Sequence, residues 1–161
     1  MGQSPSGSTL NEKNGMIFYQ GRTDFGLRYP TIRMYTSEPT RKANFDDILL
    51  SVRAPVGDIN ITLSNCCIGR GLASIRSQSY QNLLYYLLKF NKTNFNIYNG
   101  EGTVFGSIDK KSLHNFRVDI PVDCEKYESM CKLINDKCKN IHFQNMQLYK
   151  LKQLYLKKFF D

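Results

Sequence analysis

Hydrophobic residues at seven-residue intervals mark the C-terminal part of the chain. Between Tyr127 and Phe160 there is no glycine or proline, so nothing in this stretch interrupts a helix. Two series of positions, four residues apart, form the a and d positions of a heptad repeat, which is typical of a coiled-coil helix. The d series is Tyr127, Ile134, Ile141, Leu148 and Tyr155, and the a series is Cys131, Cys138, Asn145, Lys152 and Phe159.

This heptad seam predicts that the helix has a partner. A helix of this length would extend for about 50 Å, which is too long to pack along its whole length against one small domain. Asn145 and Lys152 are polar residues at a positions, where they cost stability and fix the register of pairing. We therefore expect the seam to pair with another helix. An ordinary amphipathic helix folded back on the domain is the alternative.

Shorter hydrophobic runs in the preceding part of the chain predict β-strands. Residues 16–19 form an apolar run after a turn at Asn14-Gly15. Residues 48–53 and 59–63 read as two further strands, joined by a turn at Pro55–Asp58. The arginine at the end of the first of these two strands, Arg53, must reach a surface or a partner, because a buried unpaired guanidinium is costly.

A helix and a loop are expected between these strands and the long helix. Residues 79–90 predict a helix with Ser77 or Ser79 as its N-cap. Glycines punctuate residues 100–106, which predicts a loop. Pro121 marks a boundary just before the long helix.

These elements predict an α+β fold. A mixed α/β domain over residues 1–122 is followed by one long coiled-coil-type helix over residues 123–161. A length of 161 residues with 41% hydrophobic composition suits one folded domain with an appendage. No apolar run approaches the roughly 20 residues of a membrane helix, and the N-terminus lacks the pattern of a signal peptide. We expect a cytoplasmic protein without a membrane partner.

The cysteines and histidines give no pattern of a metal site. The chain has five cysteines and two histidines, and no two cysteines form a CxxC pair. We therefore expect reduced thiols, no bound metal and no other cofactor.

The charge of the chain indicates an anionic partner. Lysine and arginine number 22 against 14 acidic residues, for a formal net charge of +8. All the arginines precede residue 118, and every basic residue after Asp123 is a lysine. Because arginine suits bidentate contact with phosphate or guanine, the domain is the part expected to bind nucleic acid. A basic domain without such a partner is the alternative.

No constellation for catalysis stands out. A GxxxxGK[ST] loop and a GxSxG motif are both absent, and the GxG triplet at residues 69–71 is equally explained by a tight turn. Asp46-Asp47 lacks a second carboxylate cluster and is better explained as the turn before a strand. The sequence favours a binding protein over an enzyme.

Five segments in order resemble a known family, the DNA-specificity subunit of type I restriction–modification systems. The resemblance spans nearly the whole chain. The segments are GQSPSGSTLN at 2–11, ANFDDILLSVRAPVGDINIT at 43–62, CIGRGLASIR at 67–76, GTVFGSIDKKSLHNFRVDIP at 102–121 and the long C-terminal helix.

The resemblance implies a non-catalytic subunit in which a target recognition domain grips double-stranded DNA and a helix acts as a spacer. Family members direct a methyltransferase subunit and, through it, a restriction subunit. They usually carry two domain–helix units and additional residues before the GQSP motif, whereas this chain has one unit and begins at that motif. A homodimer of half-subunits would read a symmetric split target. A fragment of a split gene, an inert remnant, or a basic module that binds RNA or an acidic protein are the alternatives.

The expected DNA contacts fall into two groups. Residues 21–42 and 89–102 lack a family-like pattern and are the candidates for base reading, whereas Arg53, Arg70 and Arg76 lie in family-like motifs that suit phosphate contact or a structural pair. For Arg53 the structural pair would be Asp47 or Asp58. The DNA-binding candidates are Arg22, Arg28, Arg33, Arg41, Lys42, Arg53, Arg70, Arg76, Lys89 and Lys92.

Overall fold

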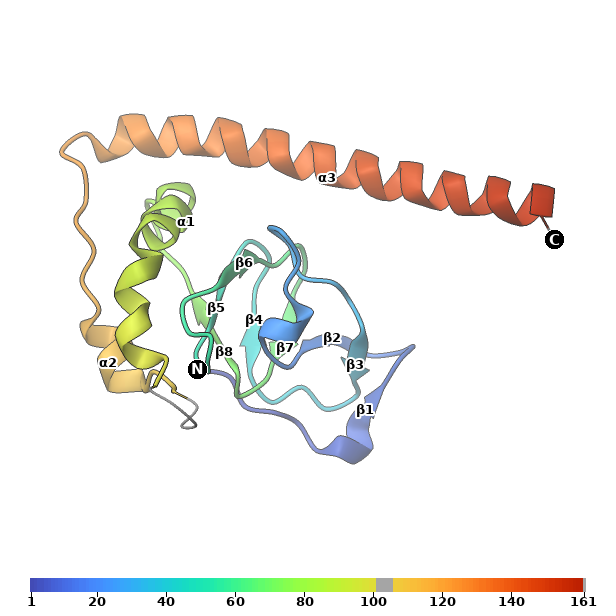
Figure 1. Ribbon diagram of the computed structural model, residues 1–161, viewed down its shortest axis with the longest axis horizontal. Coiled ribbons are helices and arrows are strands. Elements are labelled where there is room, and N and C mark those ends of the chain that lie inside the picture. The colour runs from blue at the N-terminus through green and yellow to red at the C-terminus, as the bar shows by residue number, and fades with distance from the viewer. Residues whose placement is uncertain (101–105, 161) are drawn as a thin grey trace. The chain divides into compact units, whose positions relative to one another are not determined.

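The computed structural model describes residues 1–100 and 106–160 (Figure 1). The chain divides into two compact units, Met1–Ile120 and Pro121–Asp161. The first unit combines two sheets with short helices, and the second is dominated by one long helix. The predicted α+β fold with a long C-terminal helix is therefore confirmed.

The larger sheet has five short strands. Its central pair, β2 and β7, is parallel, with Phe18 opposite Cys67. All other neighbours in this sheet are antiparallel. The strands in spatial order are β1 (Leu10–Asn11), β3 (Met34–Thr36), β2 (Met16–Tyr19), β7 (Cys66–Ile68) and β4 (Lys42–Ala43).

The smaller sheet supplies most of the buried core. It is antiparallel, in the order β6 (Ile59–Ile61), β5 (Ile48–Ser51) and β8 (Leu72–Ile75). Leu49 and Leu50 of β5 are completely buried on opposite faces, in two separate hydrophobic clusters. The central strand of this sheet is thus covered on both sides, which explains why its sequence is apolar without alternation.

The predicted strands at 48–53 and 59–63 are confirmed, although both are shorter than expected. The chain leaves the sheet after Ser51 because the backbone of Val52 bonds elsewhere: its N–H donates to Gly71 and its carbonyl accepts from Ile108. The predicted turn contains a cis Ala54–Pro55 peptide bond, and Gly57 has a φ of 94° that favours glycine.

Three helical segments lie beside the smaller sheet (Figure 1). The predicted helix is confirmed as α1 (Gln81–Phe90), which packs Leu83, Tyr85 and Leu88 into the core. Its N-cap residue is Tyr80, so the predicted N-cap at Ser77 or Ser79 is wrong; the Ser77 hydroxyl instead accepts from the Tyr80 N–H at 3.0 Å, just before the helix begins. The other two segments are η3 (Asn91–Tyr98) and α2 (Lys110–Asn115).

Residues 101–105 of the loop expected at 100–106 lie outside the described residues. The short helix after this loop was missed by the sequence patterns. Asp109 precedes α2, and its carboxylate accepts from the Ser112 N–H at 2.7 Å, which is a typical N-cap.

The long helix α3 (Cys124–Phe160) is unbroken over 37 residues. It begins slightly before the first heptad position, and the thiol of Cys124 donates to the carbonyl of Pro121. All predicted seam residues lie on this helix, and Tyr127, Ile134, Ile141, Leu148 and Tyr155 are exposed. No helix among the described residues is long and apolar enough to cross a membrane.

Candidate nucleic-acid interface

Three of the predicted arginines line one shallow hollow in the first unit. Arg22 comes from the short turn η2 (Arg22–Asp24), Arg53 follows β5, and Arg70 lies in the turn between β7 and β8. The hollow has a volume of about 310 Å³, and all three arginines are exposed to solvent. The fold thus brings together cations that are far apart in the sequence.

Glycine makes this convergence possible. The turn that carries Arg70 lies directly on the end of β2, where the Gly69 N–H donates to the Tyr19 carbonyl. A Cβ atom at Gly69 or at Gly71 would lie only 2.8 Å from the carbonyl oxygen of Gln20. The absence of these side chains therefore lets the turn of Arg70 approach the segment that leads to Arg22.

Arg53 is held in place by backbone hydrogen bonds of its two neighbours. On either side of it, the Val52 carbonyl accepts from Ile108 and the Ala54 N–H donates to Gly106. Within the described residues, the carboxylates of Asp47 and Asp58 form ion pairs with other cations. Asp47 pairs with Arg76, and Asp58 pairs with Arg22 and Lys92. The alternative in which Arg53 pairs with Asp47 or Asp58 is therefore wrong for the described residues.

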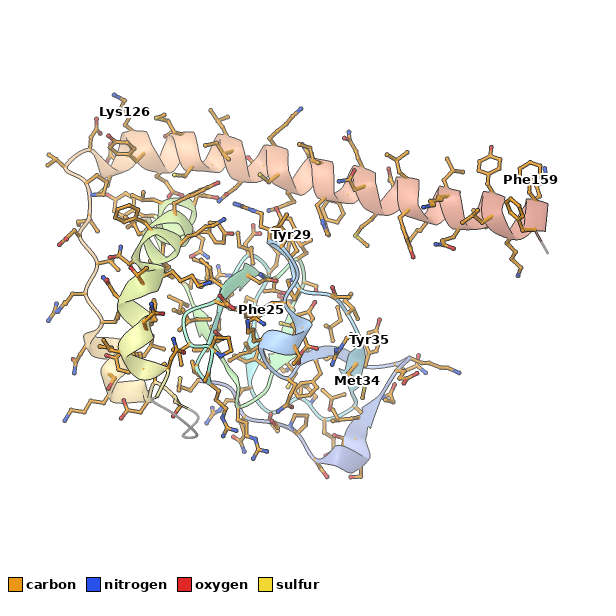
Figure 2. All side chains as sticks on the ribbon, viewed as in Figure 1. Phe25, Tyr29, Met34, Tyr35, Lys126 and Phe159 are labelled. Carbon is orange, nitrogen blue, oxygen red and sulfur yellow. The ribbon has the colours of Figure 1, made fainter. Side chains whose placement is uncertain are left out.

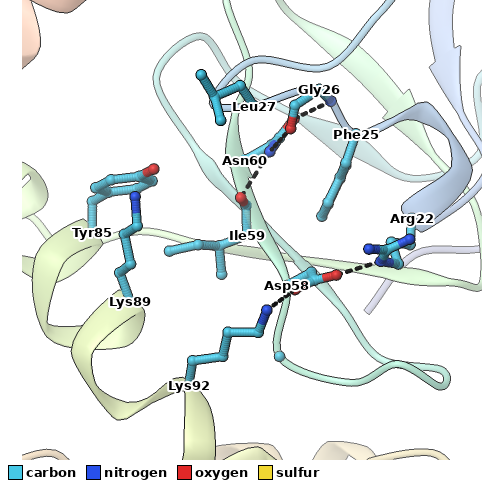
Figure 3. A pocket seen from close by; sticks show the side chains of 11 residues that line it. Arg22, Phe25, Gly26, Leu27, Asp58, Ile59, Asn60, Tyr85, Lys89 and Lys92 are labelled. Carbon is cyan, nitrogen blue, oxygen red and sulfur yellow. Dashed lines mark hydrogen bonds and ion pairs between the residues drawn. The ribbon is translucent and has the colours of Figure 1, made fainter.

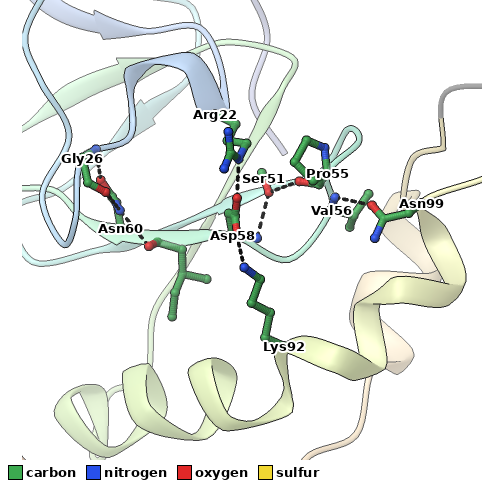
Figure 4. A network of polar contacts seen from close by, with 10 residues as sticks. Arg22, Gly26, Ser51, Pro55, Val56, Asp58, Asn60, Lys92 and Asn99 are labelled. Atoms are coloured by element: carbon green, nitrogen blue, oxygen red, sulfur yellow. Dashed lines mark hydrogen bonds and ion pairs between the residues drawn. The ribbon is translucent and has the colours of Figure 1, made fainter.

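Asp58 joins two cations of this surface (Figure 4). Its carboxylate accepts from the Arg22 guanidinium and lies 2.5 Å from the Lys92 ammonium. Its backbone N–H donates to the Ser51 hydroxyl at 2.9 Å, which fixes the carboxylate at the end of the turn. Partial burial alone would raise the pKa of Asp58, but hydrogen bonds and charge from Lys92 and Arg22 outweigh it, so the pKa lies below its usual value of 3.8.

A second basin adjoins the first and shares Arg22 with it (Figure 3). Its volume is about 360 Å³, and Lys89 of α1 and Lys92 of η3 line it together with the apolar side chains of Phe25 and Leu27. Arg22 links the two hollows into one basic surface. The concave surface presents five of the predicted cations: Arg22, Arg53, Arg70, Lys89 and Lys92.

The sequence comparison that decides the family covers almost the whole chain. The family model described as the type I restriction modification DNA specificity domain matches residues 1–153. The chain belongs to this family.

Relatives of this specificity domain are considerably longer than the chain. The putative type I restriction enzyme MjaX specificity subunit of Methanocaldococcus jannaschii is 44% identical over 125 residues, which is 75% of this chain and 29% of the relative. The HsdS subunit from Thermoanaerobacter tengcongensis is 34% identical with a TM-score of 0.70, over 98% of this chain and 40% of that chain.

Two further solved structures have similar folds. One concerns complex assembly and conformational transition of the type I R-M system; it is 35% identical with a TM-score of 0.71, over 96% of this chain and 40% of that one. The S subunit from M. genitalium is 14% identical with a TM-score of 0.68, over 98% of this chain and 41% of that one, and shows a shared fold. The specificity domain therefore spans about two fifths of these solved chains.

The remaining predicted cations of the specificity domain are not among the residues that line the two hollows. The Arg28 guanidinium stacks over the Tyr85 ring, 4.3 Å from its centroid, and Arg33 lies 3.1 Å from the buried carboxylate of Asp24. Arg76 pairs with the buried carboxylate of Asp47. Arg41 and Lys42 are exposed at the β4 edge of the larger sheet.

Two polar residues that organise the surface were not among the predicted site residues. The buried carboxylate of Asp24 accepts from the Gln20 N–H at 2.7 Å and thereby fixes the turn that carries Arg22. The buried side chain of Asn60 bonds to both polar groups of the Gly26 backbone. A single polar residue within a strand or turn indicates a hydrogen bond. The sequence does not identify the partner, because Gln20 lies in an irregular segment and Gly26 is distant from Asn60 along the chain.

Proposed function

We propose that this chain binds double-stranded DNA sequence-specifically through the concave basic surface of its first unit. The observation that carries the proposal is the convergence of Arg22, Arg53 and Arg70 in one hollow of a type I specificity domain. Guanidinium groups form charge-assisted, often bidentate bonds to phosphate, and a concave surface lets several of them reach one backbone.

The two parts of the surface have different roles in this proposal. The hollow of the three arginines is proposed to contact phosphate. Arg53 and Arg70 come from family-like segments, and Arg22 lies beside them in the hollow although it belongs to residues 21–42. Phosphate contacts fix the register of the protein on DNA, whereas contacts with base edges specify the sequence. Residues 21–42 and the described part of 89–102 remain the proposed source of base contacts, with Lys89 and Lys92 at the rim of the second basin.

Three aromatic residues favour a duplex over a single strand as the ligand. Single-strand binders stack bases on exposed aromatic rings. In this chain Tyr29 is buried and Phe25 and Tyr35 are half-buried, so these rings support the fold (Figure 2). The aromatic residues between the basic positions of 21–42 therefore do not form an exposed stacking platform.

The long helix is proposed to join two copies of the chain. Its d positions are exposed, as is Phe159 of the a series, which projects from α3 (Figure 2). Pairing would bury these side chains, and Asn145 at an a position would fix the register. A homodimer would hold two identical recognition domains related by a twofold axis, and its target would then be a symmetric, split sequence.

We propose further that the DNA-bound dimer directs a methyltransferase subunit to its target, and through that subunit a restriction subunit. In this role the chain itself performs no chemistry. If α3 pairs instead with the helix of a different specificity chain, the target becomes asymmetric, which separates the two modes of assembly.

Equilibrium binding tests the DNA-binding part of the proposal. The full chain is titrated against fluorescently labelled duplex and single-stranded DNA of the same random sequence, and anisotropy is recorded at increasing salt. The proposal predicts tighter binding to the duplex and an affinity that falls steeply with salt. Equal or tighter binding to the single strand would favour the alternative nucleic-acid module.

A further inference from the structure

Leu27 is an apolar side chain that the fold exposes completely. Its exposed fraction is 100%, and it stands at the rim of the second basin, between Phe25 and Pro30, which form an isolated β-bridge. Isolated exposed leucines are common on protein surfaces and need no function. Leu27 differs from these because the residues on both sides of it are held in place.

The residue before Leu27 is fixed by a buried amide (Figure 3). The Asn60 side chain accepts from the Gly26 N–H at 3.0 Å and donates to the Gly26 carbonyl at 3.1 Å. Asn60 is 2% exposed, so these bonds are shielded from water. A Cβ atom at Gly26 would lie 2.6 Å from the Tyr29 carbonyl oxygen, so the loop is closed tightly around this glycine.

The residue after Leu27 is fixed by its side chain and its backbone. The Arg28 guanidinium lies 4.3 Å from the centroid of the Tyr85 ring and donates to the Tyr86 hydroxyl at 3.3 Å. Its carbonyl accepts from the Ile61 N–H at 2.9 Å. The loop therefore holds the backbone at Leu27 in one position, and little backbone entropy remains to be lost when a ligand contacts this residue.

The charges around Leu27 indicate how such a ligand would be oriented. Lys89, Lys92 and Arg22 line the same basin and outnumber the one carboxylate, Asp58, that pairs with two of them. The basin therefore attracts phosphates, to which Leu27 cannot bond. In the major groove of a duplex, the apolar group that a base edge offers is the 5-methyl group of thymine. We propose that Leu27 is a specificity-determining residue that contacts a thymine 5-methyl group in the bound target. This inference rests on the proposed binding of duplex DNA.

The test begins with the target of the full chain. Duplexes that the wild-type chain retains are selected from a random pool and sequenced, and each thymine of the resulting motif is then replaced by deoxyuridine, which lacks only the methyl group. Loss of one buried methyl group predicts an affinity about fourfold lower at one position. In Leu27→Ala the same replacement should change the affinity little, and the motif should lose its preference for thymine there.

Controls separate this contact from general effects on folding or binding. Because Leu27 is fully exposed, Leu27→Ala should melt at the wild-type temperature. Ile32→Ala is the matched control, since Ile32 is an exposed apolar residue of the same segment that does not line the basin. This variant should keep the wild-type response to deoxyuridine.

Each outcome supports or overturns the proposed contact of Leu27 with thymine. A selected motif whose deoxyuridine response is lost only in Leu27→Ala supports the contact. An unchanged response in Leu27→Ala, a motif without thymine, or an equal loss of affinity for every sequence overturns the inference and leaves the proposed DNA binding intact. A wild-type chain that retains no duplex preferentially overturns the proposed function as well.

Discussion

Replacing Arg53 with alanine removes one cation of the arginine hollow without breaking an ion pair of the described residues. The side chain is exposed, and the backbone bonds that hold the segment, from Ile108 to Val52 and from Ala54 to Gly106, do not involve it. We therefore expect the melting temperature of Arg53→Ala to stay close to that of the wild type. Any large change should appear in DNA binding.

The size of that change follows from the proposed phosphate contact. Each neutralised phosphate contributes about 0.9 to the slope of log affinity against log salt concentration, so Arg53→Ala should reduce the slope by about 0.9. A hydrogen bond to a charged group contributes about 1.5 kcal/mol or more, which corresponds to an affinity roughly tenfold lower. Replacing all of Arg22, Arg53 and Arg70 should reduce the slope further, by about 2.7 if each contacts its own phosphate.

Fluorescence anisotropy with a duplex at several salt concentrations measures both quantities. Arg117→Ala is the matched control, because Arg117 is also exposed but lies outside both hollows. The control should lower the slope much less than Arg53→Ala. An unchanged slope in Arg53→Ala, or an equal fall in both variants, would refute the phosphate role and leave only an effect of net charge.

Three further variants test the framework around this surface. Asn60→Ala leaves the Gly26 N–H and carbonyl without their buried partner and should lower the free energy of unfolding by about 2 kcal/mol in urea titrations, whereas exposed Asn94→Ala should not. Because the folded pKa of Asp58 lies below 3.8, its ionised form stabilises the fold above that pH, and this contribution is lost as the pH falls through the folded pKa. The difference in the free energy of unfolding between wild type and Asp58→Asn should therefore shrink under acid. A difference that stays constant with pH would contradict this role of Asp58. Leu148→Asp should convert a dimer to monomers in sedimentation experiments while Gln147→Asp, which is off the seam, should not; a wild-type monomer would count against pairing.

Regular elements of this protein are largely predictable from its sequence. The heptad seam predicts α3 because a period of seven residues places its members on one face of a helix, whatever else surrounds it. The strands β2, β5 and β6 are predicted by compact apolar runs between turns. The end of β5 is less predictable, since it depends on bonds from Val52 to Gly71 and Ile108, which are distant in sequence.

The arrangement of the charged residues is much less predictable. Local sequence marks Arg28, Arg53 and Arg76 as similar isolated arginines, yet the fold stacks the first on Tyr85, exposes the second in a hollow and pairs the third with Asp47. Which carboxylate or ring meets each guanidinium depends on tertiary packing. Leu27 shows the same limit, because its presentation depends on Asn60, in a strand far along the chain.

A methylation map shows whether this chain directs DNA modification to a specific target. The chain is expressed with a type I methyltransferase subunit in a host free of DNA methylation, and modified adenines are read across the genome. We expect a split, symmetric motif that disappears when the chain is omitted and when Arg22, Arg53 and Arg70 are all replaced by alanine. A motif that is asymmetric would contradict the homodimer. The absence of any motif, although both proteins are soluble and associated, would contradict the proposed role in DNA specificity.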